Sequence, residues 1–168
     1  MVSSRLLERV AAEARGHCAE KGYVRGRNWN PLIPQDSVAV LAMARELTMS
    51  GAFDRYIAVA PEGHVYGYFF ERLGARVLSI FVDYPPTRVE SADDLSVIHG
   101  QRVLLIEDDV VSGISLDLVM KEIAQHEPSS VSLYLGRKKD SQQLHNIPSQ
   151  IDRVYLAEDN LDTARRGR

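Results

Sequence analysis

The sequence predicts an α/β fold: a three-layer parallel sheet flanked by helices on both faces. Short, continuous apolar runs indicate strands that are buried on both sides, and they alternate with segments of helical spacing. Such alternation is typical of parallel βαβ units. The chain has 168 residues, which is the length of one domain.

The amino-terminal part predicts two helices joined by a loop. Apolar residues recur at helical spacing between residues 3 and 20, and Gly22 ends this pattern. Residues 23–36 contain Asn and Pro and predict a loop. A second helix is expected over residues 38–49, where Gly51 stops it.

The rest of the chain alternates between strands and helices. Strands are expected over residues 56–60, 77–82, 103–106, 131–135 and 154–156. Helices are expected over residues 65–73 and 115–125, and a polar, proline-containing loop over residues 84–96. No linker divides the chain, so we expect a single domain over residues 1–168. Its core covers about residues 38–140, and a small hood is formed by about residues 1–35 and 141–168.

Composition and charge exclude several classes of protein. Hydrophobic residues make up 45% and charged residues 26%, which argues against a disordered chain. The net charge of −3 gives no general attraction to nucleic acids or anionic membranes. There is neither an apolar run of transmembrane length nor a signal-peptide core. The single cysteine, Cys18, permits no internal disulfide, so we expect a cytoplasmic protein.

The most informative motif follows the strand predicted at residues 103–106. Glu107 and Asp108 stand at its carboxyl end, where ligands bind in open α/β sheets. The next turn, residues 111–115, contains two serines and a glycine before a helix begins. Glycine permits close approach of the backbone, and amides at a helix amino terminus attract anions. A carboxylate pair followed by an anion cradle suits a 5-phosphosugar, which has hydroxyls at one end and a phosphate at the other.

Two simpler interpretations stay open at this point. The acids can be a solvated strand end, and Ser112 or Ser115 can be only the cap of the following helix. A phosphoreceiver domain also has acids after an apolar strand, but its later strands need on the order of 100 further residues at normal domain size. Only about 60 residues follow the acids here, which excludes that class.

Residues 103–116 resemble the signature of the type I phosphoribosyltransferases: an apolar strand, two acids, a short spacer and Thr/Ser-Gly-x-Thr/Ser. Ser112 and Gly113 fix the frame, which makes Glu107 and Asp108 the family's acidic pair. The similarity is greatest to the hypoxanthine-guanine branch and extends over roughly residues 38–165. It includes Asp93-Asp94-Leu95-Ser96 and Gly100-Gln101-Arg102.

This resemblance implies transfer of the 5-phosphoribosyl group from phosphoribosyl diphosphate (PRPP) to a purine-like nitrogenous base or a related small acceptor. Diphosphate is then released, Mg²⁺ is the cofactor, and the protein is a homodimer. Glu107 and Asp108 are implied as the catalytic residues. The residues implied to bind the 5-phosphate are Val111, Ser112, Gly113, Ile114 and Ser115.

The resemblance also assigns the rest of the site. Diphosphate contacts are implied for Pro61, Glu62, Gly63, Tyr84, Arg88 and Arg165. Contacts with the base are implied for Arg137, Val154 and Tyr155, where the residue that stacks on the base can be any of residues 151–155. Asp159 is implied to reach the metal.

Three positions depart from the family pattern. Val111 stands where the purine branch has an Asp that handles the ring proton of the base, and valine is no acid or base. Glu62 adds an anion near the diphosphate, and Arg137 replaces a Lys. These departures indicate a carboxylate-bearing or otherwise unusual acceptor, or a regulator of the same fold that binds PRPP or a nucleotide without chemistry. In that alternative the basic tail, residues 165–168, contacts RNA; otherwise neither nucleic acid nor a membrane is expected as a partner.

Overall fold

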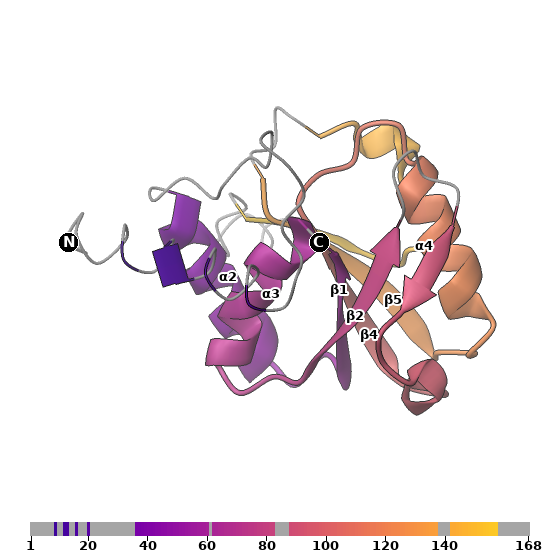
Figure 1. Ribbon diagram of the computed structural model, residues 1–168, viewed down its shortest axis with the longest axis horizontal. Helices are drawn as coiled ribbons and strands as arrows, with labels where there is room; N and C mark the ends of the chain where they lie inside the picture. Colours follow the sequence, from indigo (N-terminus) through magenta and orange to yellow (C-terminus); the bar gives the residue numbers. More distant parts are fainter. Residues whose placement is uncertain are drawn as a thin grey trace, which may run out of the picture.

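The computed structural model describes residues 36–60, 62–82, 88–137 and 142–157, and a few residues nearer the amino terminus. Those few are Arg9, Ala12, Glu13, Gly16 and Glu20, which are helical, as predicted for residues 3–20. A sheet forms the centre of the described region, with helices on both sides of it (Figure 1).

The sheet has six strands in the order β3-β2-β1-β4-β5-β6. Their bounds are β1 Arg55–Ala60, β2 Val77–Val82, β3 Val89–Ser91, β4 Arg102–Glu107, β5 Ser130–Leu135 and β6 Val154–Leu156. Neighbouring strands run parallel except β3, which is antiparallel to β2. Parallel pairing brings the carboxyl ends of β1, β4 and β5 to one edge of the sheet.

Three longer helices cover the sheet: α2 Asp36–Met49, α3 Glu62–Arg72 and α4 Ile114–Ala124. Two short 3₁₀ helices are also present, η1 Leu95–Ile98 and η3 Leu144–Asn146. In Figure 1, α2 and α3 lie on one side of the sheet and α4 on the other. No helix in this described part is both long and apolar enough to cross a membrane.

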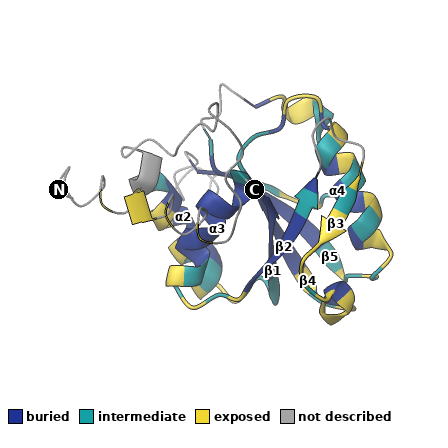
Figure 2. Ribbon diagram, in the orientation of Figure 1, coloured by how far each residue is buried: buried dark blue, intermediate teal, exposed yellow. Residues whose placement is uncertain are grey.

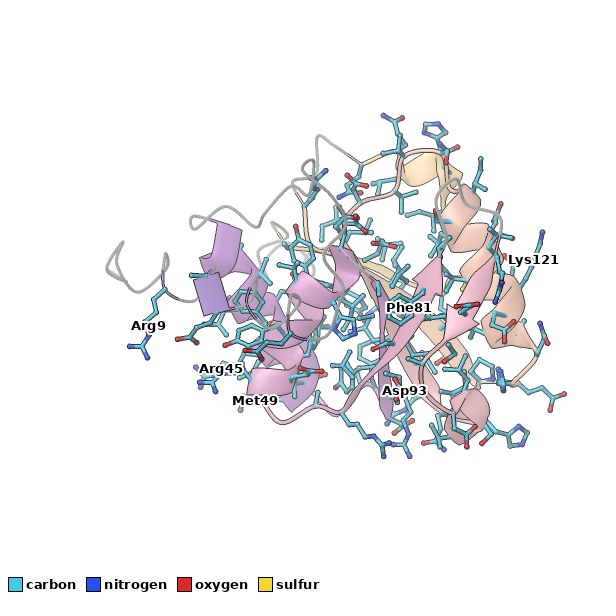
Figure 3. All side chains as sticks on the ribbon, viewed as in Figure 1. Arg9, Arg45, Met49, Phe81, Asp93 and Lys121 are labelled. Atoms are coloured by element: carbon cyan, nitrogen blue, oxygen red, sulfur yellow. The ribbon has the colours of Figure 1, made fainter. Side chains whose placement is uncertain are left out.

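Successive strand residues pack into two separate cores because side chains alternate between the faces of a strand. On β1, Ala58 and Ala60 pack with α2 and α3, whereas Ile57 and Val59 pack on the side of α4. The central strands and the inner faces of the helices are largely buried, whereas the edge strand β3 is mostly exposed (Figure 2). Exposed side chains cover the outer faces, including Met49 on α2 and Lys121 on α4 (Figure 3). The predicted three-layer fold is confirmed.

Two elements differ from the sequence prediction. Residues 84–96 were expected to form a loop, but they contain β3 and the start of η1. β3 is a three-residue edge strand with one apolar residue, Val89. Its pairing with β2 stabilises it, and the strand is too short for alternation of apolar residues to reveal it. α3 begins at Glu62 instead of residue 65, so residues 62 and 63 belong to a helix and not to a loop. The extent of the single domain and its hood stays a prediction.

Candidate functional site

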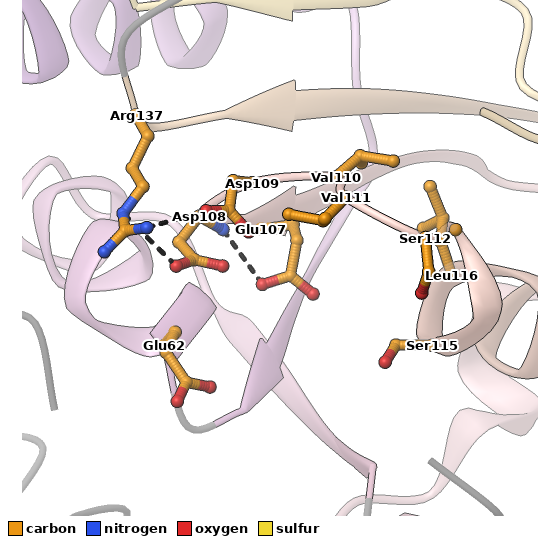
Figure 4. A pocket seen from close by; sticks show the side chains of 11 residues that line it. Glu62, Glu107, Asp108, Asp109, Val110, Val111, Ser112, Ser115, Leu116 and Arg137 are labelled. Carbon is orange, nitrogen blue, oxygen red and sulfur yellow. Dashed lines mark hydrogen bonds and ion pairs between the residues drawn. The ribbon is translucent and has the colours of Figure 1, made fainter. Parts of the chain in front are cut away.

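A polar pocket of about 390 Å³ opens at the carboxyl edge of the sheet, beside the ends of β4 and β5. Most of its lining comes from the connection between β4 and α4, to which α3 adds Glu62 and the segment after β5 adds Arg137. Arg137 lies at one end of the pocket and Ser112 and Ser115 at the other, with the carboxyl pair between them (Figure 4). The lining residues are Glu62, Glu107, Asp108, Asp109, Val110, Val111, Ser112, Gly113, Ser115, Leu116 and Arg137.

Glu107 and Asp108 are carboxyl groups held in a largely dry environment. Glu107 ends β4 with only 8% of its surface exposed, and its Oε1 accepts a hydrogen bond of 2.9 Å from the backbone N–H of Asp108. Burial raises the pKa of Glu107 well above its ordinary value, and the charges of Asp108 and Glu62 add to this. Burial, together with the charge of Asp109, raises the pKa of Asp108 to about 6. A cation or hydroxyl donors would therefore stabilise the ionised pair.

Arg137 provides a positive charge beside these acids. Its Nη1 donates to Asp109 Oδ2 at 2.7 Å, and its Nε lies 3.5 Å from Asp108 Oδ2. Backbone hydrogen bonds set the position of this arginine, because its N–H donates to the carbonyl of Asp108 at 2.9 Å. Gly136 is required just before it, since a Cβ there would lie 2.1 Å from the ring of Tyr66. The loops after β4 and β5 are thus joined at the site.

The amino terminus of α4 forms the opposite wall. Its N-cap is Gly113, which has a φ of +78° and no side chain to cap the helix. Ser112 Oγ accepts only a long hydrogen bond, 3.4 Å, from the N–H of Ile114. The first helical hydrogen bond runs from Asp117 N–H to the carbonyl of Gly113, so the earlier amides have no helical acceptor. Together with the hydroxyl of Ser115, this wall is suited to an anion.

Eight of the predicted site residues meet in this pocket. They are Glu62, Glu107, Asp108, Val111, Ser112, Gly113, Ser115 and Arg137. Ile114 does not line it, although it lies in the first turn of α4 and is 50% exposed. Four further predicted residues, Pro61, Tyr84, Asp159 and Arg165, lie outside the described residues.

The other predicted residues have different surroundings. Gly63 packs against β4, where a Cβ would lie 2.4 Å from the carbonyl oxygen of Ile106, so close helix–strand packing accounts for this glycine. Arg88 forms an ion pair with Glu90 of β3. Val154 and Tyr155 lie within β6 and not beyond its end. Val154 packs on the α4-side core, while the ring of Tyr155 meets that of Phe53 with 5.9 Å between centroids.

Sequence reasoning missed Gln142. Its side chain is buried and accepts a hydrogen bond of 2.8 Å from the N–H of Val110, a residue of the pocket wall. No local motif marks this glutamine, because its partner lies 32 residues earlier and reaches it only in the folded chain. Among the described residues there is no group of three or more His, Cys, Asp or Glu arranged to hold a metal ion.

Neither a family model nor a curated protein sequence matches the chain, but solved structures do. A hypoxanthine-guanine phosphoribosyltransferase from Bacillus anthracis is 17% identical with a TM-score of 0.52, over 71% of this chain and 76% of that one. A purine phosphoribosyltransferase from Pyrococcus horikoshii is 18% identical with a TM-score of 0.55, over 74% and 84%. A hypothetical protein from Neisseria gonorrhoeae with bound ppGpp is 17% identical with a TM-score of 0.53, over 77% and 88%.

These similarities define the class of fold: the chain has the fold of the type I phosphoribosyltransferases. The mostly parallel six-stranded sheet between helices is the shared architecture.

Proposed function

We propose that the protein transfers the 5-phosphoribosyl group of PRPP to a nitrogenous base or a related small acceptor and releases diphosphate. One observation carries the proposal: a buried carboxyl pair and an uncapped helix amino terminus line the same pocket. The carboxyl pair suits a sugar diol and the helix terminus suits a phosphate, so both ends of a 5-phosphoribosyl group have a matching partner. The phosphoribosyltransferase fold supports the same conclusion.

In this reaction the bond from C1 of the ribose to the diphosphate breaks, and a bond forms between C1 and the acceptor nitrogen on the opposite face. Positive charge builds on the ribose as diphosphate leaves. Ionised Glu107 and Asp108 accept hydrogen bonds from the ribose hydroxyls and place negative charge near that cation. The amides and hydroxyls of residues 112–115 hold the 5-phosphate, which orients C1 toward the acceptor.

The donor chemistry of the pocket fits Mg²⁺. Such an ion prefers oxygen ligands and is commonly held by few carboxylates together with substrate phosphates. Glu107 and Asp108 offer carboxylate oxygens at the pocket, and the sequence adds Asp159 as a candidate. When bound, the ion neutralises charge on the leaving diphosphate.

The acceptor side of the pocket supports a ring that carries anionic or carbonyl groups. Val111 is 60% exposed at the pocket and offers no proton-transfer group. Arg137 is held there by Asp109, and a guanidinium recognises planar oxygen acceptors. We therefore propose an acceptor whose nitrogen loses its proton to solvent, with a carboxylate or carbonyl directed at Arg137.

A second candidate is a regulator that binds PRPP or a nucleotide without transferring the ribosyl group. Val111 favours it, because the side chain supplies no acid or base at this position. Glu62 also favours it, because this side chain adds a further carboxylate to the pocket that would receive diphosphate.

Diphosphate release distinguishes the two candidates. The protein is incubated with PRPP, Mg²⁺ and a panel of purines, pyrimidines and carboxylated rings, and Asp108→Asn serves as the inactive control. Release with one acceptor class, lost in the variant, is the expected result. PRPP binding without release for any acceptor would favour the regulator, and a protein that binds neither PRPP nor a nucleotide would reject both candidates.

A further inference from the structure

Residues 142–147 form a segment that lies against the pocket wall. Gln142 is its buried end, with 9% of its surface exposed. The amide oxygen of Gln142 accepts from the N–H of Val110 at 2.8 Å. Its amide nitrogen approaches two carbonyl oxygens, that of Asp108 at 3.3 Å and that of Arg137 at 3.4 Å. One side chain therefore joins the loop that carries the acids to the loop that carries the arginine.

The far end of the segment contacts the phosphate cradle, which is the backbone of residues 111–115 at the amino terminus of α4. Asn146 Nδ2 donates a hydrogen bond to the carbonyl oxygen of Val111. The carbonyl of Asn146 lies so close to Gly113 that a Cβ there would come within 2.4 Å of it. Between these contacts, the N–H of Gln143 donates to the carbonyl of Val110 at 2.8 Å. The backbone from Val110 to Gly113 is thus held from the side of this segment.

We propose that Gln142 and Asn146 are positioning residues for the transfer reaction. Gln142 fixes the loop of Asp108, which is proposed to bind the ribose hydroxyls, relative to Arg137. Asn146 fixes the backbone that is proposed to receive the 5-phosphate. This inference rests on the proposed function, since it assigns the two subsites of a 5-phosphoribosyl ligand to the two ends of one segment.

The different targets of the two side chains predict different kinetic effects. Gln142 holds the backbone of Asp108 and Arg137, whose side chains act at C1 and at the acceptor, so its loss should lower turnover. Asn146 supports a wall that binds the phosphate in both ground state and transition state, so its loss should weaken affinity. Loss of a residue with only a structural role would lower the stability of the protein and would impair turnover and affinity together.

Two substitutions test this division. Gln142→Met should lower kcat for diphosphate release by about 10- to 100-fold, as loss of a supporting partner typically does, while the Kd for ribose 5-phosphate changes less than about threefold. Asn146→Leu should raise that Kd by about tenfold, which corresponds to one lost hydrogen-bonding support of about 1.4 kcal/mol. Calorimetry gives the Kd, and urea unfolding reports the stability of each variant.

The neighbouring Gln143→Met is the matched control, because that side chain is exposed and its backbone hydrogen bond is retained. It should change neither kcat nor Kd.

If Gln142→Met does not fold, Gln142→Glu takes its place. Glutamate keeps the shape and the acceptor for Val110 but, when ionised, lacks the donors to Asp108 and Arg137.

A double-mutant cycle then tests whether Gln142 acts through Arg137. In an Arg137→Met background the further loss from Gln142→Met should be several-fold smaller than in the wild type, because the guanidinium that Gln142 positions through the backbone of residue 137 is gone. Equal losses in both backgrounds, or parallel changes in kcat and Kd for both single variants, would overturn the inference and leave the proposed function standing. A wild-type protein that does not bind ribose 5-phosphate would reject the proposed function and this inference with it.

Discussion

Glu107 and Asp108 illustrate how a binding site works against stability. Both carboxyl groups are largely buried, and their pKa values are raised because their ionised forms lose hydration. Arg137 offsets part of this for Asp108, because its charge lowers the pKa of that carboxyl. The chain thus holds two acids whose ionisation is unfavourable until a ligand or cation approaches.

Asp108→Asn should therefore stabilise the protein while it abolishes function. The folded pKa of about 6 lies above the ordinary value of 3.8, so the wild type loses stability as pH rises from about 4 through about 6. The variant lacks this loss and should unfold with a free energy greater by about 1–3 kcal/mol at pH 8. Urea unfolding at pH 8 and pH 4 measures this, and the difference should shrink at pH 4. A less stable variant at pH 8 would mean that the carboxylate supports the fold.

The activity should require the ionised form of Asp108. Turnover is expected to fall as pH decreases through about 6, because protonation removes the negative charge near C1. Arg137→Met should move this acidic limb to higher pH, since Arg137 lowers the pKa of Asp108. Profiles of kcat/KM between pH 5 and pH 8 measure both effects. An unchanged limb in the variant would contradict the role assigned to this pair.

At the residue scale, local motifs were predictable and contacts between distant segments were not. Glu107, Asp108 and Ser112 belong to one short stretch whose order shows that acids precede a helix start. Gln142 and Asn146 join the site through hydrogen bonds that span 32 and 35 residues, and no local pattern marks them. Contact of Val154 and Tyr155 with the base stays a prediction. Both residues lie within β6, where Val154 packs in the core on the side of α4 and Tyr155 packs against Phe53.

At the scale of elements, the start of α4 has the most demanding geometry. Gly113 adopts a positive φ, which few other residues tolerate, and its backbone touches the carbonyl of Asn146. The turn therefore depends on glycine for two independent reasons, its conformation and the space around it.

Gly113→Ala should lower the free energy of unfolding by about 2–4 kcal/mol, since strain and overlap add. It should also abolish binding of ribose 5-phosphate, because the amides of the cradle shift. Gly51→Ala is the control, since Gly51 has a φ of +62° with no atom within 4 Å of an added Cβ. This control should cost about 1 kcal/mol of strain and keep the affinity. Equal effects of the two variants on Kd would show that the cradle does not bind the phosphate.

The sequence predicted the buried strands best, because burial requires a continuous run of apolar residues that can be recognised in the sequence. β2 and β6 have the predicted bounds, and the other predicted strands are shifted by one residue at most at either end. β3 was missed because it is only three residues long, two of them, Glu90 and Ser91, are polar and exposed, and its pairing with β2 is a tertiary contact. The early start of α3 was missed because the glycine at position 63 suggested a loop, whereas it permits packing against Ile106.

At the scale of the whole molecule, the parallel sheet gathers the site. β1, β4 and β5 are neighbours, so segments that are distant in sequence leave the sheet at one edge and build one pocket. The α/β architecture was predictable because both faces of the sheet are apolar and covered. The hood and the homodimer remain predictions. The roles of Tyr84, Asp159 and Arg165 also remain predictions, since these residues lie outside the described region.

The most direct test is a crystal structure of the protein with ribose 5-phosphate. The account predicts the phosphate against the amides of residues 112–115 and the 2- and 3-hydroxyls within hydrogen-bond distance of Glu107 and Asp108. A sugar phosphate bound elsewhere, with this pocket filled only by water at saturating ligand, would contradict it.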